Sequence, residues 1–410
     1  MTVQPGVRVR EAAAPAASPA PAASPASPAS PASPASPASP NAAAPASRSR
    51  LPSLTGMRFV AALLVFLYHA SLPHVATDLF ADGGAAETYR QVLSRAGWVG
   101  VSFFFVLSGF VMTWSARPGD RAVSFWRRRF FKVFPNHAVM WVLGLLLIAA
   151  STTGAAQAVP NLLLVQSWFH DIDVYFSVNP PSWSLSCELL FYLTFPFWAR
   201  LVRRIRADRL WWYAGGTVAA VVGVALAADL FVPGSPVIEV PYAVSEPQFW
   251  LVYILPATRL LDFVLGILMA RIVLEGRWTG PGLLTAGLLT VAAYGVSLLV
   301  PPPYAINAVT IAPFALLIPA AAVADVNGTR SPFRGRVMLW LGEVSFAFYM
   351  VQQVLLEFAR GRMGARWALP TPLALAVLAL EAGAALLCAW LLYICVERPA
   401  MRFARPRKRT

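Results

Sequence analysis

The sequence predicts an all-α protein that crosses a membrane about ten times. Of its 410 residues, 58% are hydrophobic and only 13% are charged, whereas charged residues make up about 25% of an ordinary soluble domain. The apolar residues gather in stretches long enough for a transmembrane helix, which needs about 20 residues. Together these observations favour a polytopic helix bundle embedded in a lipid bilayer.

Residues 1–50 precede the first apolar stretch and consist largely of Ala, Ser and Pro, with repeated Pro-Ala-Ser triplets. Such a composition cannot bury a core and is typical of a disordered or polyproline-like chain. We expect a solvated tail and not a secretory signal peptide, because no apolar run follows the first basic residues directly. The predicted organisation is this tail, a transmembrane domain over 51–397 and a basic tail over 398–410.

Ten apolar stretches are expected to be spans, and basic residues sort the segments between them. The spans lie near 54–72, 97–115, 136–152, 182–199, 211–231, 248–270, 281–300, 306–324, 339–358 and 371–396. Basic residues cluster after spans two, four, six and eight and at the C-terminus, while the segments after spans three, five and seven carry none. By the positive-inside rule, both termini are cytoplasmic. The net charge of +14 therefore indicates topology and not nucleic acid, because no basic domain with interleaved aromatic residues is present.

The first span contains two ionisable side chains that project from one face of its helix. Arg58 and His69 are eleven residues apart, which is three turns plus about 20° and about 16 Å along the axis. If Arg58 lies near one surface of a hydrocarbon layer about 30 Å thick, His69 lies near its middle. Ionisable residues inside a span are costly and mark functional sites, and histidine can act as a general base near neutral pH. Alone, the histidine could equally bond a neighbouring helix, and the arginine could reach the interface with its charge.

Span four supplies a carboxylate, Glu188, in the stretch PPSWSLSCELLFYLTFP. It lies about 9 Å inside the predicted outer end of the helix at Ser182, so we expect it at a depth comparable with that of His69. A carboxylate there needs a partner, and it could orient His69 and stabilise its protonated form. Pairing with the backbone or with another helix is the alternative.

Arg127, Arg128, Arg129 and Lys132 form a basic cluster in the predicted cytoplasmic segment before span three. Arg129 and Lys132 are one helical turn apart and could bind one anion together, with the planar fork of arginine suited to phosphate. Basic cytoplasmic segments are also common topology signals. The cluster alone therefore establishes no binding site.

Polar residues in the other spans are expected to be structural. The three-residue spacing of Arg259 and Asp262 predicts an internal ion pair, and Gly109 predicts a close helix contact. Gln352 and Gln353 could line a cavity or join helices. The cysteines have no CxxC or Cys/His metal spacing, so we expect free thiols and neither a disulfide nor a metal. They are Cys187, Cys388 and Cys395.

Together these motifs resemble those of the membrane acyltransferase-3 family, which includes bacterial surface-polysaccharide O-acetylases and macrolide O-acyltransferases. The matching stretches run in the family's order from residue 51 to residue 399 and include LTGMRFVAALLVFLYHAS, FWRRRFFKVFP, PSWSLSCELLFYLTFP and YICVERP. The resemblance implies a multi-pass enzyme of the cell membrane. Such an enzyme transfers an acyl group, usually acetyl, from cytoplasmic acyl-CoA to a hydroxyl of a glycan or secondary metabolite.

The same resemblance assigns roles to individual residues. His69 takes the place of the essential histidine, Arg58 that of its arginine partner and Glu188 that of the span-four glutamate. Arg129 and Lys132 match the basic motif of span three, which with its neighbours would hold the CoA phosphates at the cytoplasmic mouth.

Two positions differ from the family's pattern. Lys132 stands where arginine is common, which weakens the case for a bidentate phosphate contact there, and Gln352 stands where a histidine is frequent, so no proton-transfer role passes to it. The main alternative from another class is a transporter, because ionisable residues in a bundle can form a path for a substrate or for protons. A transporter predicts inverted repeats, and the sequence shows no clear repeat.

Overall fold

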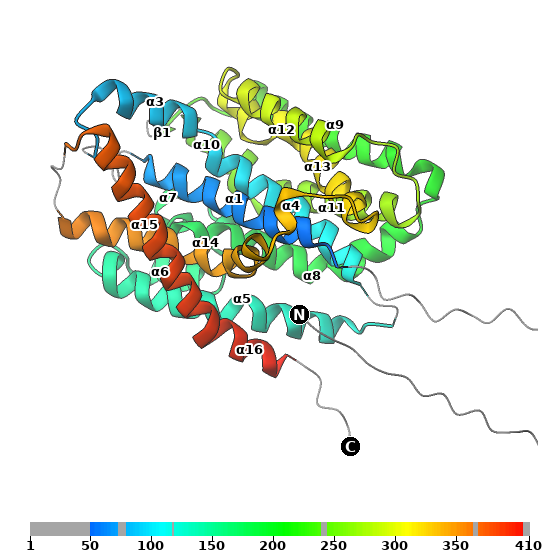
Figure 1. Ribbon diagram of the computed structural model, residues 1–410, viewed down its shortest axis with the longest axis horizontal. Helices are drawn as coiled ribbons and strands as arrows, with labels where there is room; N and C mark the ends of the chain where they lie inside the picture. The colour runs from blue at the N-terminus through cyan, green and yellow to red at the C-terminus, as the bar shows by residue number, and fades with distance from the viewer. Residues whose placement is uncertain (1–49, 73–78, 117–118, 239–243, 364–367, 405–410) are drawn as a thin grey trace, which may run out of the picture. The chain divides into compact units, whose positions relative to one another are not determined.

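The computed structural model describes residues 50–72, 79–116, 119–238, 244–363 and 368–404. In this part of the chain the structure is helical almost throughout, and its one sheet is a hairpin in which β1 (Val237–Ile238) pairs antiparallel with β2 (Val244–Ser245). The predicted all-α fold is thus confirmed (Figure 1). The Ala/Ser/Pro-rich tail up to residue 49 and the last six residues of the basic end lie outside the described residues.

The α-helices follow one another from residue 52 to residue 403. They are α1 (Pro52–Ala70), α3 (Gly83–Leu93), α4 (Ala96–Ser115), α5 (Ala122–Gly144), α6 (Ala155–Leu162), α7 (Ile172–Tyr175), α8 (Trp183–Arg203), α9 (Leu210–Phe231), α10 (Glu246–Phe249), α11 (Pro256–Leu274), α12 (Leu283–Ser297), α13 (Val309–Val326), α14 (Arg336–Met363), α15 (Thr371–Leu392) and α16 (Arg398–Phe403). Single π-helical turns adjoin four of them: η1 (Leu145–Ala149), η5 (Trp250–Ile254), η6 (Tyr304–Ala308) and η8 (Tyr393–Glu397).

Nine helical segments of the described chain are long and apolar enough to cross a membrane. They correspond to nine of the ten expected spans. The other expected span, near 281–300, is the 15-residue helix α12. At 1.5 Å per residue it is about 22 Å long, which is shorter than a hydrocarbon layer of about 30 Å.

The basic cluster before span three is helical, which corrects the predicted start of that span near residue 136. Helix α5 begins at Ala122 and continues through Pro135 to Gly144. A proline inside a spanning helix is tolerated where neighbouring helices satisfy the backbone groups that it frees. The charges of 127–132 therefore lie along the first turns of a long helix and not in a loop.

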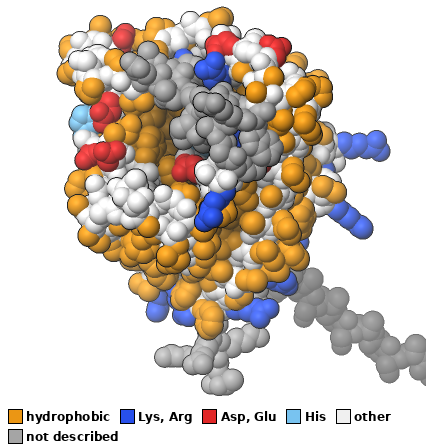
Figure 2. Space-filling view, turned by 90° about the vertical axis from the view of Figure 1, so that its left-hand side faces the viewer, with side chains coloured by type: hydrophobic (Ala, Val, Ile, Leu, Met, Phe, Trp, Pro, Cys, Tyr) orange, Lys and Arg blue, Asp and Glu red, His pale blue; other side chains and the backbone are white. Residues whose placement is uncertain are grey.

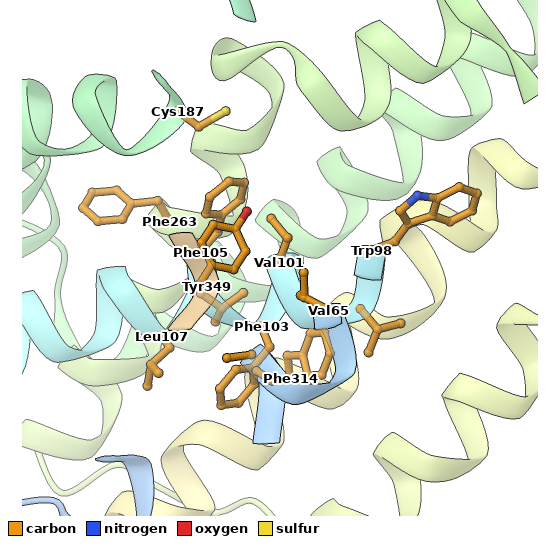
Figure 3. Packing of buried hydrophobic residues seen from close by; sticks show 14 of the residues in the cluster. Val65, Trp98, Val101, Phe103, Phe105, Leu107, Cys187, Phe263, Phe314 and Tyr349 are labelled. Atoms are coloured by element: carbon orange, nitrogen blue, oxygen red, sulfur yellow. The ribbon is translucent and has the colours of Figure 1, made fainter. Parts of the chain in front are cut away.

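Helix α4 lies at the centre of the bundle, packed against α1, α8, α11 and α13. Its contact with α11 is reciprocal: a Cβ at Gly109 would lie 2.0 Å from the carbonyl oxygen of Phe263, and one at Gly266 would lie 2.0 Å from that of Val106. The close helix contact predicted at Gly109 is thus confirmed. Figure 3 shows Phe105 and Phe263 among the buried side chains around this contact.

Helix α1 packs between α4 and α14, which fixes the position of both its ionisable residues. Its first turn is held by Asp325 of α13, whose carboxylate accepts hydrogen bonds from the backbone N–H and the Oγ of Ser53 at 2.8 and 2.7 Å. Gly342 of α14 approaches the carbonyl of Thr55 so closely that a Cβ would lie 2.0 Å from the oxygen. The two helices are therefore in backbone contact.

Arg259 and Asp262 form the internal ion pair that their spacing predicts. Their side chains are 1% and 0% exposed, and Nη2 of Arg259 lies 2.9 Å from Oδ2 of Asp262. Arg259 also donates to Oγ of Ser102 at 2.7 Å, and Asn307 donates to Asp262 at 2.8 Å. The pair therefore links α4, α11 and η6 and balances its own charge inside the bundle, while Nε and Nη1 of Arg259 have no hydrogen-bond partner among the described residues.

Hydrophobic side chains cover much of the surface, as a bilayer requires. Figure 2 looks onto the end of the bundle that carries α3, α7 and β1 in Figure 1, and hydrophobic side chains surround it. Exposed examples on the long helices include Phe231, Leu284 and Leu380. All three cysteines are free, and while Cys187 is buried, Cys388 and Cys395 are exposed on this apolar surface.

Candidate active site

His69 lines a cavity of about 290 Å³, here called the His69 cavity. Its walls come from α1, α4, α8 and α14 and from the segments around α7, β1 and η5, and they are rich in aromatic side chains. These are Tyr68, Trp98, Phe176, Trp183, Phe249, Tyr253 and Tyr349. Ile172, Phe176 and Pro180 come from the long segment between α5 and α8.

His69 lies in the last turn of α1, about 26 Å along the axis from Pro52. This differs from the expected position near the middle of the span. The expectation placed Arg58 at the membrane surface, but α1 begins six residues before it. Arg58 therefore lies farther from an end of α1 than His69, which is in the last turn of the helix.

The ring of His69 is held from α14. The side-chain amide of Gln352, which is completely buried, lies 2.6 Å from its Nδ1. The next residue, Gln353, lines the His69 cavity and donates to Glu357 at 2.7 Å. Glu357 also lines the cavity, so this is the carboxylate that shares a cavity with His69. Sequence reasoning missed it, although Gln353 and Glu357 are four residues apart and so share one face of α14.

Glu188 lies in a different, small pocket of about 50 Å³, together with Arg58. Its carboxylate accepts a hydrogen bond from the hydroxyl of Tyr192, and the charges of Arg58, Arg129 and Lys132 act on it. The expected depth was counted from Ser182 as if that residue lay at the surface. Ser182 is in fact completely buried, bonded by Asn161 and Gln166 of the outer segment, so α8 starts inside the bundle.

The Arg58 pocket adjoins the His69 cavity, because Val101 and Tyr349 line both. The hydroxyl of Tyr349 is fixed by Ser184 Oγ at 2.9 Å and by the carbonyl of Pro181 at 3.0 Å. Side chains of α4 and α14 thus separate the two spaces. Arg58 and His69 both face this wall, as their spacing on one helix face predicted.

A third and larger cavity, of about 1230 Å³, is lined by arginines and is here called the arginine cavity. It lies where α4 and α8 end, α5 begins and α16 packs. Its charged lining residues are Asp120, Arg128, Arg129, Arg200, Arg203, Arg398 and Arg402. Arg128 pairs with Asp120, which leaves a strong excess of positive charge.

The four residues of the predicted basic cluster have different partners. Arg128 and Arg129 line the arginine cavity. Lys132 instead pairs with Glu397, which is 1% exposed, and Arg127 donates to the carbonyl of Phe403. Lys132 is therefore held by η8 and does not line the arginine cavity beside Arg129.

Arg129 connects the arginine cavity to the Arg58 pocket. Its guanidinium lies 5.7 Å from the ring centroid of Tyr192, the residue that donates to Glu188, and 5.4 Å from that of Phe125. Its Nε is buried and has no hydrogen-bond partner among the described residues. Sequence patterns offered no reason to select the four further arginines of the cavity, because basic residues at span ends serve equally as topology signals.

Shared side chains and contacts relate the three spaces to one another. Val101 and Tyr349 line both the His69 cavity and the Arg58 pocket, and Arg129 of the arginine cavity lies beside Tyr192, which bonds Glu188 of the Arg58 pocket. The arginine cavity suits phosphate groups, because arginine binds them through two parallel hydrogen bonds. The His69 cavity offers an imidazole among apolar walls, which suits proton transfer away from bulk water. Among the described residues, no group of three or more His, Cys, Asp or Glu side chains could hold a metal ion.

Comparison with known proteins identifies the family to which this chain is similar. Residues 51–394 match the family model described as an acyltransferase domain. The chain is 43% identical over 374 residues to acyltransferase MdmB of Streptomyces mycarofaciens, which covers 88% of this chain and 94% of that protein. It is 26% identical over 230 residues to peptidoglycan O-acetyltransferase OatA of Listeria monocytogenes, covering 50% of this chain and 33% of that protein. No solved structure matches.

Proposed function

Since this chain belongs to the acyltransferase-3 family, we propose that it transfers an acyl group from cytoplasmic acyl-CoA to an acceptor hydroxyl, with His69 as the general base. Family membership and the nine apolar helices already make it a multi-pass membrane acyltransferase. Membership also favours group transfer over the transporter that the intramembrane charges alone would allow. The acyl donor, the general base and the acceptor are the parts of the reaction that we propose.

The observation that supports this proposal most is the series of three spaces between the arginine cavity and His69. A donor with a phosphate-bearing head and a long flexible arm fits such a series. The head would occupy the arginine cavity, and the arm would extend past Arg129 and Arg58 towards the His69 cavity. The distance from Arg58 to His69 along α1 is about 16 Å.

The arginine cavity supports acyl-CoA as the donor. Six arginines and one aspartate line it, and CoA carries several phosphate charges. Its volume of about 1230 Å³ exceeds the range of about 300–1,000 Å³ that is common for small-molecule sites. By the positive-inside rule this arginine-rich end is cytoplasmic, the compartment in which acyl-CoA is made. We also place the protein in the cell membrane, which the relative named a peptidoglycan O-acetyltransferase supports.

In the proposed reaction, His69 takes the proton of the acceptor hydroxyl as its oxygen attacks the thioester carbonyl. The C–S bond then breaks, and the CoA sulfur leaves with the proton that the imidazole returns. The products are the acyl ester and free CoA. The aromatic walls of the His69 cavity would exclude water and so limit hydrolysis of the thioester. Arg58 and Glu188, which share one pocket, would hold the arm of the donor while balancing each other's charge.

The acceptor is a glycan or a secondary metabolite with a free hydroxyl. Aromatic side chains line much of the His69 cavity, and aromatic faces pack against the apolar faces of sugar rings and macrocycles. One relative is named a peptidoglycan O-acetyltransferase, which supports a glycan acceptor. The more similar one is named only an acyltransferase, so its name favours neither class, although it matches this chain over 94% of its own length.

The test is acyl transfer by the purified protein in lipid nanodiscs. Labelled acetyl-CoA is supplied with a panel of glycan and macrocyclic alcohols, and mass spectrometry measures free CoA and acylated acceptor. We expect CoA release that depends on the acceptor and disappears in His69→Ala. Substrate flux into vesicles without CoA release would support a transporter, and full activity of His69→Ala would remove the histidine from the mechanism.

A further inference from the structure

Gln352 holds the ring of His69 from the neighbouring helix. Its side-chain amide lies 2.6 Å from Nδ1 of His69, and its side chain is completely buried. The contact rests on two fixed elements, because α1 and α14 approach each other at backbone distance where Gly342 meets Thr55. With Nδ1 engaged, Nε2 is the ring nitrogen that can accept a proton from an acceptor in the His69 cavity.

The direction of this hydrogen bond decides whether His69 can act as a base. The oxygen and nitrogen of an amide side chain occupy almost the same space, so shape does not tell them apart. If the amide N–H donates to Nδ1, the neutral ring carries its proton on Nε2, which then has no lone pair to offer. If the amide oxygen instead accepts from Nδ1–H, the lone pair lies on Nε2.

A second observation favours the oxygen. With the amide nitrogen placed at Nδ1, the Oε1 of Gln352 is buried and has no hydrogen-bond partner in the described part of the chain. A buried acceptor without a partner is unfavourable. Rotating the amide by half a turn brings this oxygen to Nδ1–H and gives it a partner.

We propose that Gln352 is a positioning residue that keeps the proton of neutral His69 on Nδ1 by accepting its hydrogen bond. The inference rests on the proposed function, in which Nε2 takes the acceptor proton and then returns it to the leaving thiolate. Throughout that cycle the amide stays neutral and exchanges no proton. Nδ1–H remains bonded to the amide oxygen, which also stabilises the imidazolium while it exists.

Four other titratable groups line the His69 cavity. They are Tyr68, Tyr253, Tyr349 and Glu357. Glu357, the one acidic residue among them, accepts a hydrogen bond from Gln353 on its own helix. The amide of Gln352 is thus the group that the structure places on Nδ1.

The tautomer can be observed directly. The chain contains four histidines, so a protein labelled with ¹⁵N in its imidazole rings gives few signals, and subtracting the spectrum of His69→Gln identifies those of His69. The ¹⁵N shifts of a neutral ring tell a protonated nitrogen from an unprotonated one. We expect the proton of neutral His69 on Nδ1 in the wild-type protein. A proton on Nε2 would overturn the proposal.

Kinetics provide a second test that a purely structural role would not pass. Gln352→Leu keeps the size and removes the hydrogen bond. We expect kcat to fall about 10- to 100-fold, the typical effect of losing a partner that orients a functional histidine, with little change in either KM. Gln352→Glu restores an acceptor oxygen and should recover most of that loss. If Gln352→Leu turns over like the wild type, the amide does not position the ring.

A matched control is Gln166→Leu. Gln166 is also a completely buried glutamine with an unpartnered Oε1, it donates to Ser182, and it lines none of the three spaces. It should lower stability without the drop in kcat. The activity of His69→Ala distinguishes failure of the proposed function from failure of the positioning role of Gln352. If that variant is active, the proposed function fails; if it is inactive while Gln352→Leu is active, the positioning role alone fails.

Discussion

His69 differs from the other described histidines in what its ring contacts. His137 is completely buried on α5, with Nε2 bonded to the carbonyl of Asn161 at 3.0 Å. His170 is exposed and stands 5.1 Å from the ring of Trp250. His69 instead combines a fixed Nδ1 with a place on a cavity wall. A fixed ring beside space for a substrate is what a general base needs.

Replacing His69 by alanine should abolish transfer without unfolding the bundle. A missing general base costs on the order of 10²- to 10⁴-fold in kcat. The affinity for acyl-CoA should persist, because the arginine cavity lies elsewhere. Thermal unfolding, acyl-CoA binding and turnover are measured for His69→Ala, with His170→Ala as a control that should behave like the wild type. A deficit of only a few-fold would assign His69 a packing role.

Glu188 and Arg58 should behave as a coupled pair. Each single neutral variant, Glu188→Gln or Arg58→Gln, removes one of the two opposite charges that line a small pocket, and loss of a compensating charge at a buried site is costly. We expect both to lower the unfolding temperature and kcat. The double variant should lose less stability than the sum of the two single losses, which a double-mutant cycle on unfolding temperatures measures. Strict additivity would show that the residues act independently.

The sequence predicted which side of α1 the ionisable residues share, but not where the helices begin and end. Helical arithmetic correctly turned Arg58 and His69 towards one side, the wall of Val101 and Tyr349. It could not show that α1 ends right after His69 or that Ser182 is buried, because those facts depend on how distant segments pack. Gln352, which is 283 residues from His69 in the chain, carried no local signal of the contact.

Whole elements are held together by a few specific contacts, and the crossing of α4 and α11 is one of the closest. Gly109→Ala would place a Cβ 2.0 Å from the carbonyl of Phe263, whereas a Cβ at Gly216 on α9 meets nothing within 4 Å. Overpacking typically costs about 1–3 kcal/mol. We expect Gly109→Ala to lower the unfolding temperature markedly and Gly216→Ala to leave it unchanged or slightly higher, since alanine favours helix. Equal unfolding temperatures would mean that the helices can separate without cost.

The pair of Lys132 and Glu397 joins α5 to the C-terminal helices. Glu397 is 1% exposed and also accepts from Asn136 at 2.7 Å. Lys132→Gln leaves this carboxylate without its cation, so it should lower stability while leaving the KM for acyl-CoA nearly unchanged. Thermal unfolding and the KM for acyl-CoA check this, and Lys132→Gln with Glu397→Gln should regain part of the stability. A large rise in KM would instead return Lys132 to the donor site.

Sequence patterns predicted the boundaries of some helices incorrectly. The basic run before Pro135 was placed outside span three, which was expected to start near residue 136, yet α5 begins at Ala122. One face of this stretch lines the arginine cavity, while Val133 and Asn136 are buried. Likewise, α12 is shorter than the apolar stretch that predicted it, because its length depends on where its turns form.

At the scale of the whole molecule, charge is distributed along the series of cavities. The sequence predicted the arginine-rich end from the positive-inside rule. It could not predict that arginines from α5, α8 and α16 line one cavity, since they are up to 274 residues apart in the chain. A topology signal and a candidate phosphate site thus use the same residues.

The last prediction concerns the side from which the donor enters. If the arginine cavity holds the CoA phosphates, Arg129→Gln and Arg398→Gln should each raise the KM for acyl-CoA about tenfold, as expected for losing a charged hydrogen bond. The KM for the acceptor should stay constant, because the acceptor occupies the His69 cavity. Arg206→Gln is the matched control: Arg206 is 71% exposed, pairs with Asp208 and does not line the arginine cavity.

Oriented vesicles separate this arrangement from its reverse. Acyl-CoA does not cross a bilayer, so it should support transfer when supplied on the side of the arginine-rich end and not when supplied on the other. The KM should also rise with salt, because ions screen charge over about 8 Å at physiological strength, and Arg129→Gln should weaken that dependence. Transfer that occurs only when acyl-CoA is supplied at the end that carries α3 and α7 would contradict this arrangement. The donor would then bind in the His69 cavity, and the arginines of the arginine cavity would serve only as topology signals.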